Sequence, residues 1–211
     1  MMQHNLDPAV ARGHNSLAMA CLLGLGLILA SAVQADAAAC ADASVTNPHM
    51  AATTPTSDFV LHDDGTATHV PTGLMWQRCS QGRVWDGQAG RCTPGIDLEL
   101  TWFAAHRYVE EVNANGGPAG HDDWRLPNLN EFESIAELAC WNPGINTEVF
   151  PDIYFGGNER YWSSSPFSQA PSGTSSAWTA QFSDGGLIDI SLWSTNRILL
   201  VRDADPVAPD D

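Results

Sequence analysis

Apolar residues recur at helical spacing in two stretches of the chain, residues 100–117 and 128–141. The spaced positions are Trp102, Ala105, Tyr108, Val109 and Val112 in the first stretch, and Leu129, Phe132, Ile135, Ala136 and Leu138 in the second. Side chains three and four positions apart share one face of a helix, so this period predicts two amphipathic helices. Thr101 and Asn128 are the expected N-caps, and Glu131 follows Asn128 at the spacing of a capping box.

Short apolar or alternating runs bounded by Gly, Asp and Pro predict strands in the rest of the chain. Residues 59–70 and 177–191 are each expected to form a hairpin around an Asp-Gly turn. Single strands are expected at 72–79, 160–165 and 196–203. Strands, then two helices, then strands again indicate an α+β fold, with the two helices packed on a small antiparallel twisted sheet.

The N-terminal segment has the composition of a secretory signal peptide. Residues 17–33 are apolar, Arg12 precedes them, and small residues follow. We assign residues 1–35 to a signal peptide, with cleavage before Asp36 or before Cys40. An uncleaved membrane anchor and a lipid on Cys40 are the alternatives, so any membrane contact is expected only through this segment.

Composition divides the remainder into three parts. Residues 36–57 are rich in Ala, Thr, Ser and Pro and are expected to form an extended lead-in. Residues 58–203 carry the helical and strand patterns and form the expected single domain, which is long enough to bury a core. Residues 204–211 are acidic and contain proline, which predicts a disordered tail.

Four cysteines remain once the signal segment is removed. An even number in an exported chain predicts two disulfides, although four cysteines allow three pairings. Cys79 and Cys92 flank a Gly-rich polar loop, so the preferred pairing joins them and leaves Cys40 to join Cys140. A zinc site is the rival, but the chain has no C-x-x-C and no histidine at ligand spacing from a cysteine.

The charge of the chain narrows the classes of partner. Its formal net charge is −16, and all nine basic residues are arginine. A strongly negative surface repels phosphate backbones and sulfated polymers. Nucleic acids and polyanions are therefore not expected as partners, whereas neutral sugars, proteins and divalent cations remain open.

The stretch "HDDWRLP" combines Asp122, Asp123, Trp124 and Arg125 directly before Pro127. The proline favours extended backbone before the second helix, and the arginine is expected to pair with one of the two aspartates or to stack on an indole. This reading makes the stretch a structural corner. A calcium site built on Asp122 and Asp123 is the alternative, and otherwise no cofactor or metal is expected.

Patterns that suggest catalysis have simpler interpretations. The serines of "YWSSSP", residues 161–166, lack a recognisable base or nucleophile motif, and they suit a strand whose hydroxyls bond to nearby backbone groups. Glu110 and Glu111 are adjacent on a helix, so they do not face each other as a glycosidase pair requires. We therefore expect no enzymatic activity, with a hydrolase as a remote alternative.

Two of the eight tryptophans lie in polar loops, Trp85 and Trp193. Indoles in such positions stack on sugar rings or contact partner proteins. These residues are the candidate ligand-binding residues, although packing in the core is the usual role of a tryptophan.

Several motifs appear together in the order of a known family. They are "DDGTATHVPTGLMWQRC", "TWFAAHRYVEEVN", "GHDDWRLPNLNEFESI", "NPGINTEVFPD", "YWSSSP" and "AWTAQFSDG". Over residues 58–203 the chain strongly resembles the Lcl C-terminal domain family of bacterial proteins, named for a collagen-like adhesin. The looser order "RLP…E…YWSSS…G…R" is similar to bacterial domains with a C-type-lectin-like fold.

This resemblance implies an exported, non-enzymatic module on bacterial surface proteins. For the namesake adhesin it implies sulfated glycosaminoglycans as ligands and a trimer formed by a collagen-like stalk. This chain has no Gly-X-Y repeat and no lysine, so neither property carries over.

Together these observations predict a secreted, periplasmic or cell-surface binding or adhesion module that contacts a glycan or a surface protein through its loops. A structural or assembly component of a cell-surface appendage is the alternative. The sequence does not indicate an oligomeric state.

Overall fold

The computed structural model of the chain describes residues 39–153, 159–167, 175–183 and 185–206. All of them belong to one unit, Gln34–Asp211. The predicted signal peptide, residues 1–35, lies outside the described residues, as does the end of the predicted tail, 207–211.

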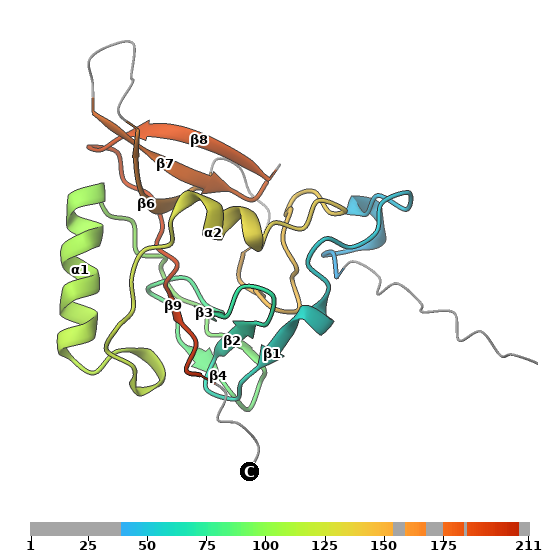
Figure 1. The fold of residues 1–211 in the computed structure, drawn as a ribbon, viewed down its shortest axis with the longest axis horizontal. Coiled ribbons are helices and arrows are strands. Elements are labelled where there is room, and N and C mark those ends of the chain that lie inside the picture. Colours follow the sequence, from blue (N-terminus) through green and yellow to red (C-terminus); the bar gives the residue numbers. More distant parts are fainter. Residues whose placement is uncertain (1–38, 154–158, 168–174, 184, 207–211) are drawn as a thin grey trace, which may run out of the picture. The chain divides into compact units, whose positions relative to one another are not determined.

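A four-stranded antiparallel sheet joins the beginning of the domain to its end (Figure 1). Its order is β1 (Phe59–Leu61), β2 (Thr66–His69), β3 (Leu74–Gln77) and β9 (Val201–Asp203). The first three strands follow the predicted hairpin and strand. The last strand comes from the far end of the chain and pairs with β3, so it joins the end of the domain to its beginning.

A second sheet is an antiparallel meander of β6 (Tyr161–Phe167), β7 (Ser176–Gln181) and β8 (Gly186–Ser191). A third, two-stranded sheet pairs β4 (Trp85–Asp86) with β5 (Arg91–Cys92). The sequence indicated only a loop between the two cysteines there. The fold is thus mixed α+β, with several small antiparallel sheets rather than one.

The first predicted helix is α1 (Trp102–Ala114), and the second is α2 (Leu129–Ser134). Thr101 has the extended backbone of an N-cap but makes no side-chain capping bond, contrary to expectation. The predicted capping box of α2 is present, with Asn128 and Glu131 bonded reciprocally. Within the described part of the chain, no helix has the length and apolar character needed to cross a membrane.

The second helix was predicted to run to residue 141, and it ends instead at Ser134. The cause is Glu137, which is fully buried and faces the N-terminal arm. Its carboxylate accepts hydrogen bonds from the backbone N–H groups of Thr53, Thr54 and Ala139, at 2.8–3.1 Å. These bonds satisfy a buried charge that a continued helix would leave without partners.

Two apolar cores lie on opposite faces of the same strands. Leu199 and Val201 belong to the first core, whereas Ile198 and Leu200 belong to the second. Successive residues of an extended chain point to opposite sides, so this segment forms a wall between the cores. The first core contains Trp76 and the α2 side chain Phe132, and the second contains the α1 side chains Ala105 and Val109. Figure 1 shows α1 and α2 on different sides of β9.

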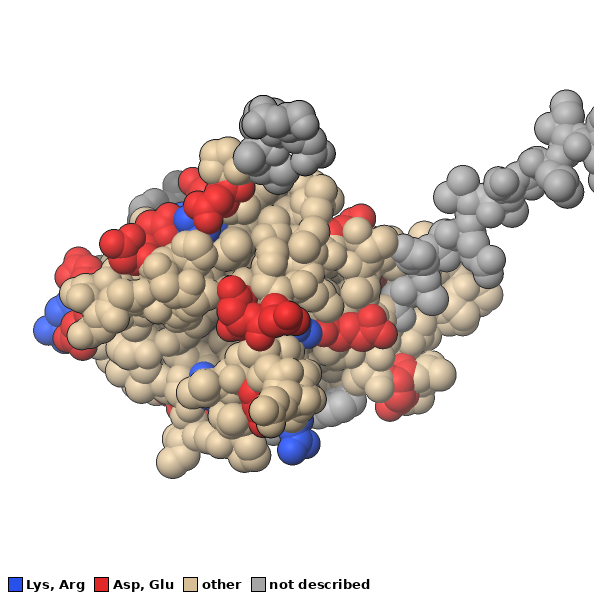
Figure 2. Space-filling view, turned by 90° about the horizontal axis from the view of Figure 1, so that it is seen from below, with Lys and Arg blue, Asp and Glu red and all other residues tan. Residues whose placement is uncertain are grey.

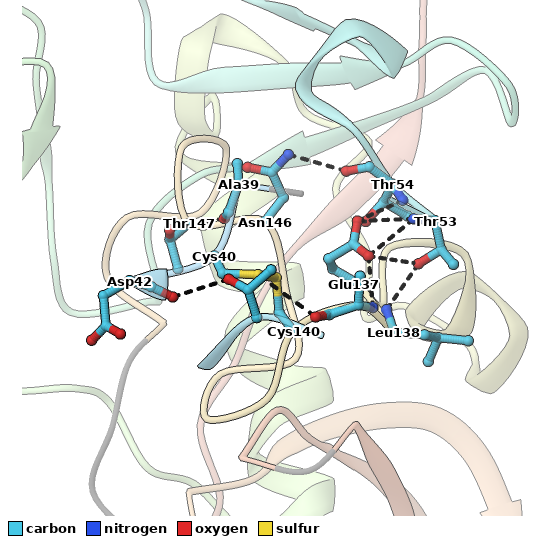
Figure 3. Close-up of a disulfide and its surroundings, with 12 residues drawn as sticks. Ala39, Cys40, Asp42, Thr53, Thr54, Glu137, Leu138, Cys140, Asn146 and Thr147 are labelled. Carbon is cyan, nitrogen blue, oxygen red and sulfur yellow. Dashed lines mark hydrogen bonds between the residues drawn. A yellow bond between two sulfur atoms is a disulfide. The ribbon is translucent and has the colours of Figure 1, made fainter. Parts of the chain in front are cut away.

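The residues expected as an extended lead-in are bound to the domain. They include the 3-10 turns η1 (Ala43–Val45) and η2 (Thr56–Asp58). A disulfide joins Cys40 to Cys140, and the Ala39 carbonyl accepts hydrogen bonds from the backbone N and the Oγ1 of Thr147, at 2.9 and 3.1 Å (Figure 3). With its sulfur in a disulfide, Cys40 has no thiol for the alternative lipid.

The first residues of the predicted tail are bound to the domain, contrary to expectation. The backbone N–H of Ala204 donates to the carbonyl of Gly73 at 2.8 Å. Asp205 accepts from Arg202 at 2.9 Å. These contacts keep residues 204 and 205 in place beside β9.

Candidate functional site

The structure fixes Trp85 on three sides. The guanidinium of Arg78 lies over the indole ring, with 4.0 Å from Cζ to the ring centroid. The indole Nε1 donates to the Asp63 carbonyl at 2.9 Å. The backbone of Gly65 abuts the indole so closely that a Cβ there would overlap Trp85. These contacts use part of the Trp85 side chain for packing within the domain, a role that the sequence did not indicate.

Beside Trp85 lies a cavity of about 470 Å³. Its walls are the turn 64–66, the end of β3, the segment 81–85, Tyr108 of α1, and Pro118–Ala119. Pro118–Ala119 lies in the 3-10 turn η3 (Pro118–Gly120). We call this space the Trp85 cavity.

Three polar side chains form a hydrogen-bonded row in the Trp85 cavity. The hydroxyl of Tyr108 donates to Gln81 Oε1 at 2.8 Å, and Gln81 Nε2 donates to Gln77 Oε1. Burial raises the pKa of Tyr108, with the charge of Glu111 acting in the same direction, so the hydroxyl stays protonated and remains a donor. Sequence reasoning missed all three side chains, because each belongs to a different segment and none stands in a motif.

Arg83, in the wall of the Trp85 cavity, belongs to a network of ion pairs. Arg83 donates to Asp97 from Nε at 2.6 Å and from Nη2 at 3.1 Å. Arg197 bonds to the same Asp97 at 2.8 Å and to Glu159 at 2.7 Å. Because each of these two guanidinium groups is paired with a carboxylate, their charges largely cancel, and the network contributes little electrostatic potential inside the cavity.

Behind this network lies the buried carboxyl group of Asp152. Its Oδ2 accepts from the backbone N–H of Ser80 at 2.7 Å, and Arg83 Nε is 3.8 Å from the same oxygen. Burial raises the pKa of Asp152 above its ordinary value, against the lowering by Ser80 and Arg83. Ser80 Oγ also bonds to the hydroxyl of Tyr161 at 2.9 Å, which uses that serine structurally.

Trp193 is the most exposed aromatic residue among the described large apolar side chains, with 77% of its surface accessible. It lies in the turn after β8 and contacts Phe103 of α1, with 6.0 Å between ring centroids. Phe103 is itself 47% exposed. Trp102 packs edge-on against Phe103, and its Nε1 donates a hydrogen bond to the Ser163 carbonyl at 2.9 Å. We call the pair Trp193 and Phe103 the Trp193 surface.

The two candidate tryptophans thus belong to separate places. Trp193 contacts the first turn of α1 through Phe103, whereas the Trp85 cavity reaches α1 further along, at Tyr108. Phe103 also falls outside the apolar positions that defined the helix in the sequence. Its position in the sequence was the available signal, because an apolar residue there interrupts the polar face of an amphipathic helix.

In the stretch proposed as a structural corner, Arg125 has different partners from those expected. Arg125 pairs with Glu131 at 2.7 Å and with Asp203 at 3.2 Å, and not with Asp122 or Asp123. The reason is that the backbone of Arg125 pairs with Val201 of β9, which directs the side chain towards the start of α2.

Asp123 pairs instead with Arg202, at 2.6 and 3.2 Å, and these bonds lower the pKa of its carboxyl group. Both of its oxygens are therefore engaged, which disfavours the calcium alternative. Asp122 is exposed, with no side-chain bond to the described residues. Within the described ranges, no three His, Cys, Asp or Glu side chains are grouped so that they could hold a metal ion.

Trp124 is buried at the centre of this corner, with 2% of its surface exposed. Its Nε1 donates to the Pro118 carbonyl at 3.0 Å. Its backbone N–H and carbonyl bond to the side-chain amide of Asn113 in α1, at 3.0 and 2.8 Å. These bonds tie α1 to the segment before α2.

The serines of β6 serve the backbone, as the sequence predicted. Ser165 Oγ accepts from the backbone N–H of Leu129 at 3.0 Å. Ser163 Oγ accepts from the backbone N–H of Ser165 at 3.1 Å, and Ser164 Oγ donates to the Pro127 carbonyl at 3.3 Å. These bonds join β6 to the first turn of α2.

The structure pairs Cys79 with Cys92, as well as Cys40 with Cys140, which is the pairing preferred from the sequence. Fold and disulfides together define a disulfide-bonded α+β domain of the kind found outside the bacterial cytoplasm. A family model described as the Lcl C-terminal domain matches residues 65–202, and the chain belongs to this family. A search of curated proteins finds no match to the chain.

Proposed function

We propose that this chain is an exported, non-enzymatic binding module of the bacterial surface or periplasm, which adheres to a neutral glycan or a surface protein through its loops. The observation that carries the proposal is the exposure of Trp193 beside Phe103. A single exposed apolar residue is ordinary, but two adjacent aromatic rings, one of them packed on the partly buried Trp102, resemble the aromatic centre of a binding surface.

The fold assigned in this proposal is C-type-lectin-like. Its support is the sheet that joins β1, β2 and β3 to the last strand, with both helices between them in the chain. Between β3 and β9, Trp85 lies at the start of the short strand β4 and Trp193 lies in the turn after β8. In such an arrangement the sheets supply a rigid frame and the loops supply the contacts.

The surface charge supports neutral partners over polyanions. On the face shown in Figure 2, acidic side chains are widespread and basic ones are few. Arg83, Arg125, Arg197 and Arg202 each form ion pairs with carboxylates. Sulfated chains would therefore meet repulsion and few unpaired cations.

The test is a glycan array probed with the mature chain, with and without calcium, beside Trp193→Ala, Phe103→Ala and the control Ile96→Ala. Ile96 is 91% exposed and apolar, so it controls for a general loss of exposed apolar surface. We expect binding without calcium, weakened about tenfold or more by Trp193→Ala and unchanged by Ile96→Ala.

A stable protein partner that co-purifies with the chain and is lost with Trp193→Ala would indicate that the ligand is a surface protein rather than a glycan. A co-purifying partner that is retained by both aromatic variants, with no signal on the array, would favour the assembly role instead. Turnover of an ester or glycoside that is lost on changing one serine or histidine would overturn the non-enzymatic assignment.

A further inference from the structure

We propose that the Trp85 cavity is a second binding site, and that it takes a neutral ring bearing hydroxyl groups, such as one hexose unit. The proposal goes beyond the function proposed above, because it uses no residue of the Trp193 surface. The two sites are thus separable by mutation.

The dimensions and walls of the cavity suit a small polar ligand. Its volume of about 470 Å³ lies within the range of small-molecule sites, roughly 300–1,000 Å³. Trp85 supplies a flat apolar wall, and Gln77, Gln81, Thr66 and Tyr108 supply polar groups around it. An aromatic wall with a few convergent amide and hydroxyl groups matches a sugar ring, which has an apolar face and a polar edge.

The direction of the hydrogen bonds leaves a donor for the ligand. The row runs from the Tyr108 hydroxyl to Gln81 and from Gln81 Nε2 to Gln77 Oε1. Gln77 Nε2 then carries two hydrogens, and the residues that the structure describes provide no acceptor for them. A half-buried amide donor of this kind suits a ligand hydroxyl or ring oxygen.

The charges around the cavity favour a neutral ligand. Arg83 is paired with Asp97 at 2.6 Å. Asp64 Oδ1 accepts from the backbone N–H and the hydroxyl of Thr66, at 3.0 and 2.7 Å. An anionic ligand would lose hydration without gaining an unpaired cation from the described residues that line the cavity, and it would be repelled by Asp64.

The walls are held in place before any ligand arrives. Cys79, in the wall, is joined by a disulfide to Cys92. Gly82 has φ +92°, and a side chain there would overlap the carbonyl of Ile96, so the backbone is closely packed at this point. A site formed in advance loses little conformational entropy on binding, which favours affinity for a small ligand.

The test uses the full mature chain labelled with ¹⁵N and titrated with glucose, galactose, mannose and N-acetylglucosamine. We expect at least one sugar to shift the indole N–H signal of Trp85 and the side-chain amide signal of Gln77, and to leave the Trp193 indole signal unmoved. Trp85→Phe assigns the first signal. Gln77→Leu is expected to weaken binding about five- to tenfold, and Tyr108→Phe to weaken it less, because its hydroxyl acts through Gln81.

Trp193→Ala is the matched control, and it is expected to bind the sugar as the unchanged chain does. Loss of sugar binding in Trp193→Ala with full binding in Gln77→Leu would overturn the second site while supporting the first. The second site is also overturned if none of the four sugars shifts the Trp85 signal. Tighter binding of galacturonate than of galactose would overturn the assignment of a neutral ligand.

Discussion

Arg125 donates two hydrogen bonds to Glu131, from Nη1 to Oε2 at 2.7 Å and from Nη2 to Oε1 at 2.8 Å. The same carboxylate accepts the backbone N–H of Asn128 at 2.7 Å and so completes the capping box of α2. One side chain thus begins the helix and fixes the corner before it.

Replacing Glu131 separates these two roles. Gln at this position keeps an oxygen for the capping bond but loses the charge, whereas Ala loses both. The Arg125 side chain is 40% exposed, so solvent screens the ion pair, and we expect Glu131→Gln to lower the free energy of unfolding by about 0.2–1 kcal/mol. Glu131→Ala should lower it by about 1–3 kcal/mol. Urea denaturation measures both, and equal losses in the two variants would contradict the capping role.

The two disulfides should contribute unequally to stability. Cys40 and Cys140 are 100 residues apart in the sequence, and Cys79 and Cys92 are 13 apart. In the chain-entropy account, the longer loop contributes about 4.7 kcal/mol and the shorter about 3 kcal/mol. Replacing both cysteines of a pair by Ser should therefore cost more at Cys40 and Cys140, as measured by urea denaturation under non-reducing conditions. The reverse order would show that the N-terminal arm is loosely held.

The bonds to the Ala39 carbonyl predict that stability depends on whether the mature chain keeps this residue. A chain that starts at Cys40 lacks the carbonyl that accepts from Thr147 at 2.9 and 3.1 Å. It should be less stable than a chain that starts at Asp36, by about 1–2 kcal/mol. A chain that starts at Ala37 is the control and should match the longer one. Mass spectrometry of the exported protein would identify its first residue, and a start at Cys40 without loss of stability would contradict the argument.

Gly65 and Gly73 form a matched pair for testing the packing around Trp85. Both have positive φ, at +87° and +67°, but a Cβ at Gly65 would overlap Trp85, whereas one at Gly73 would meet nothing within 4 Å. Gly73→Ala should cost only the backbone strain, about 1–2 kcal/mol. Gly65→Ala should cost about 1–3 kcal/mol more, because the indole must shift. Thermal or urea unfolding measures the difference, and equal costs would mean that Trp85 moves without resistance.

Stability should fall as the pH is lowered from 7.5 to 5.5. Burial lowers the pKa of both His69 and His106 below the ordinary value of about 6.5, although Asp58 and Glu110 oppose the shift. The unfolded chain therefore binds protons in this range that the folded chain does not, and the stability present above about pH 6.5 is lost as the pH falls. His69→Gln and His106→Gln should each reduce the dependence on pH in urea denaturation.

Asp152 acts in the opposite sense, because burial raises its pKa and the folded state takes up that proton first. The informative quantity is therefore the difference in slope between each histidine variant and the unchanged chain. Identical slopes in all three proteins would show that neither histidine resists protonation in the folded state.

Much of the candidate site was not predictable from the sequence. Trp85 and Trp193 stand out in the sequence as indoles in polar stretches, and the structure places Trp85 at a cavity and leaves Trp193 exposed. Gln77, Gln81 and Tyr108 carry no such signal. They meet only because β3, the segment after it and α1 converge, and no local pattern encodes that convergence.

The sequence by itself determined the features that depend on neighbours along the chain. The period of apolar residues set where the helices begin, the Asp-Gly turn at Asp64 and Gly65 set the first hairpin, and the spacing of Asn128 and Glu131 set a capping box. Tertiary structure alone decided where α2 ends, because Glu137 finds its partners at Thr53 and Thr54, 84 and 83 residues away. It also decided the partner of Arg125 and the shape of the Trp85 cavity. A buried charge or a cavity wall is settled by whichever groups folding brings within hydrogen-bonding reach, and these groups lie far apart in the chain.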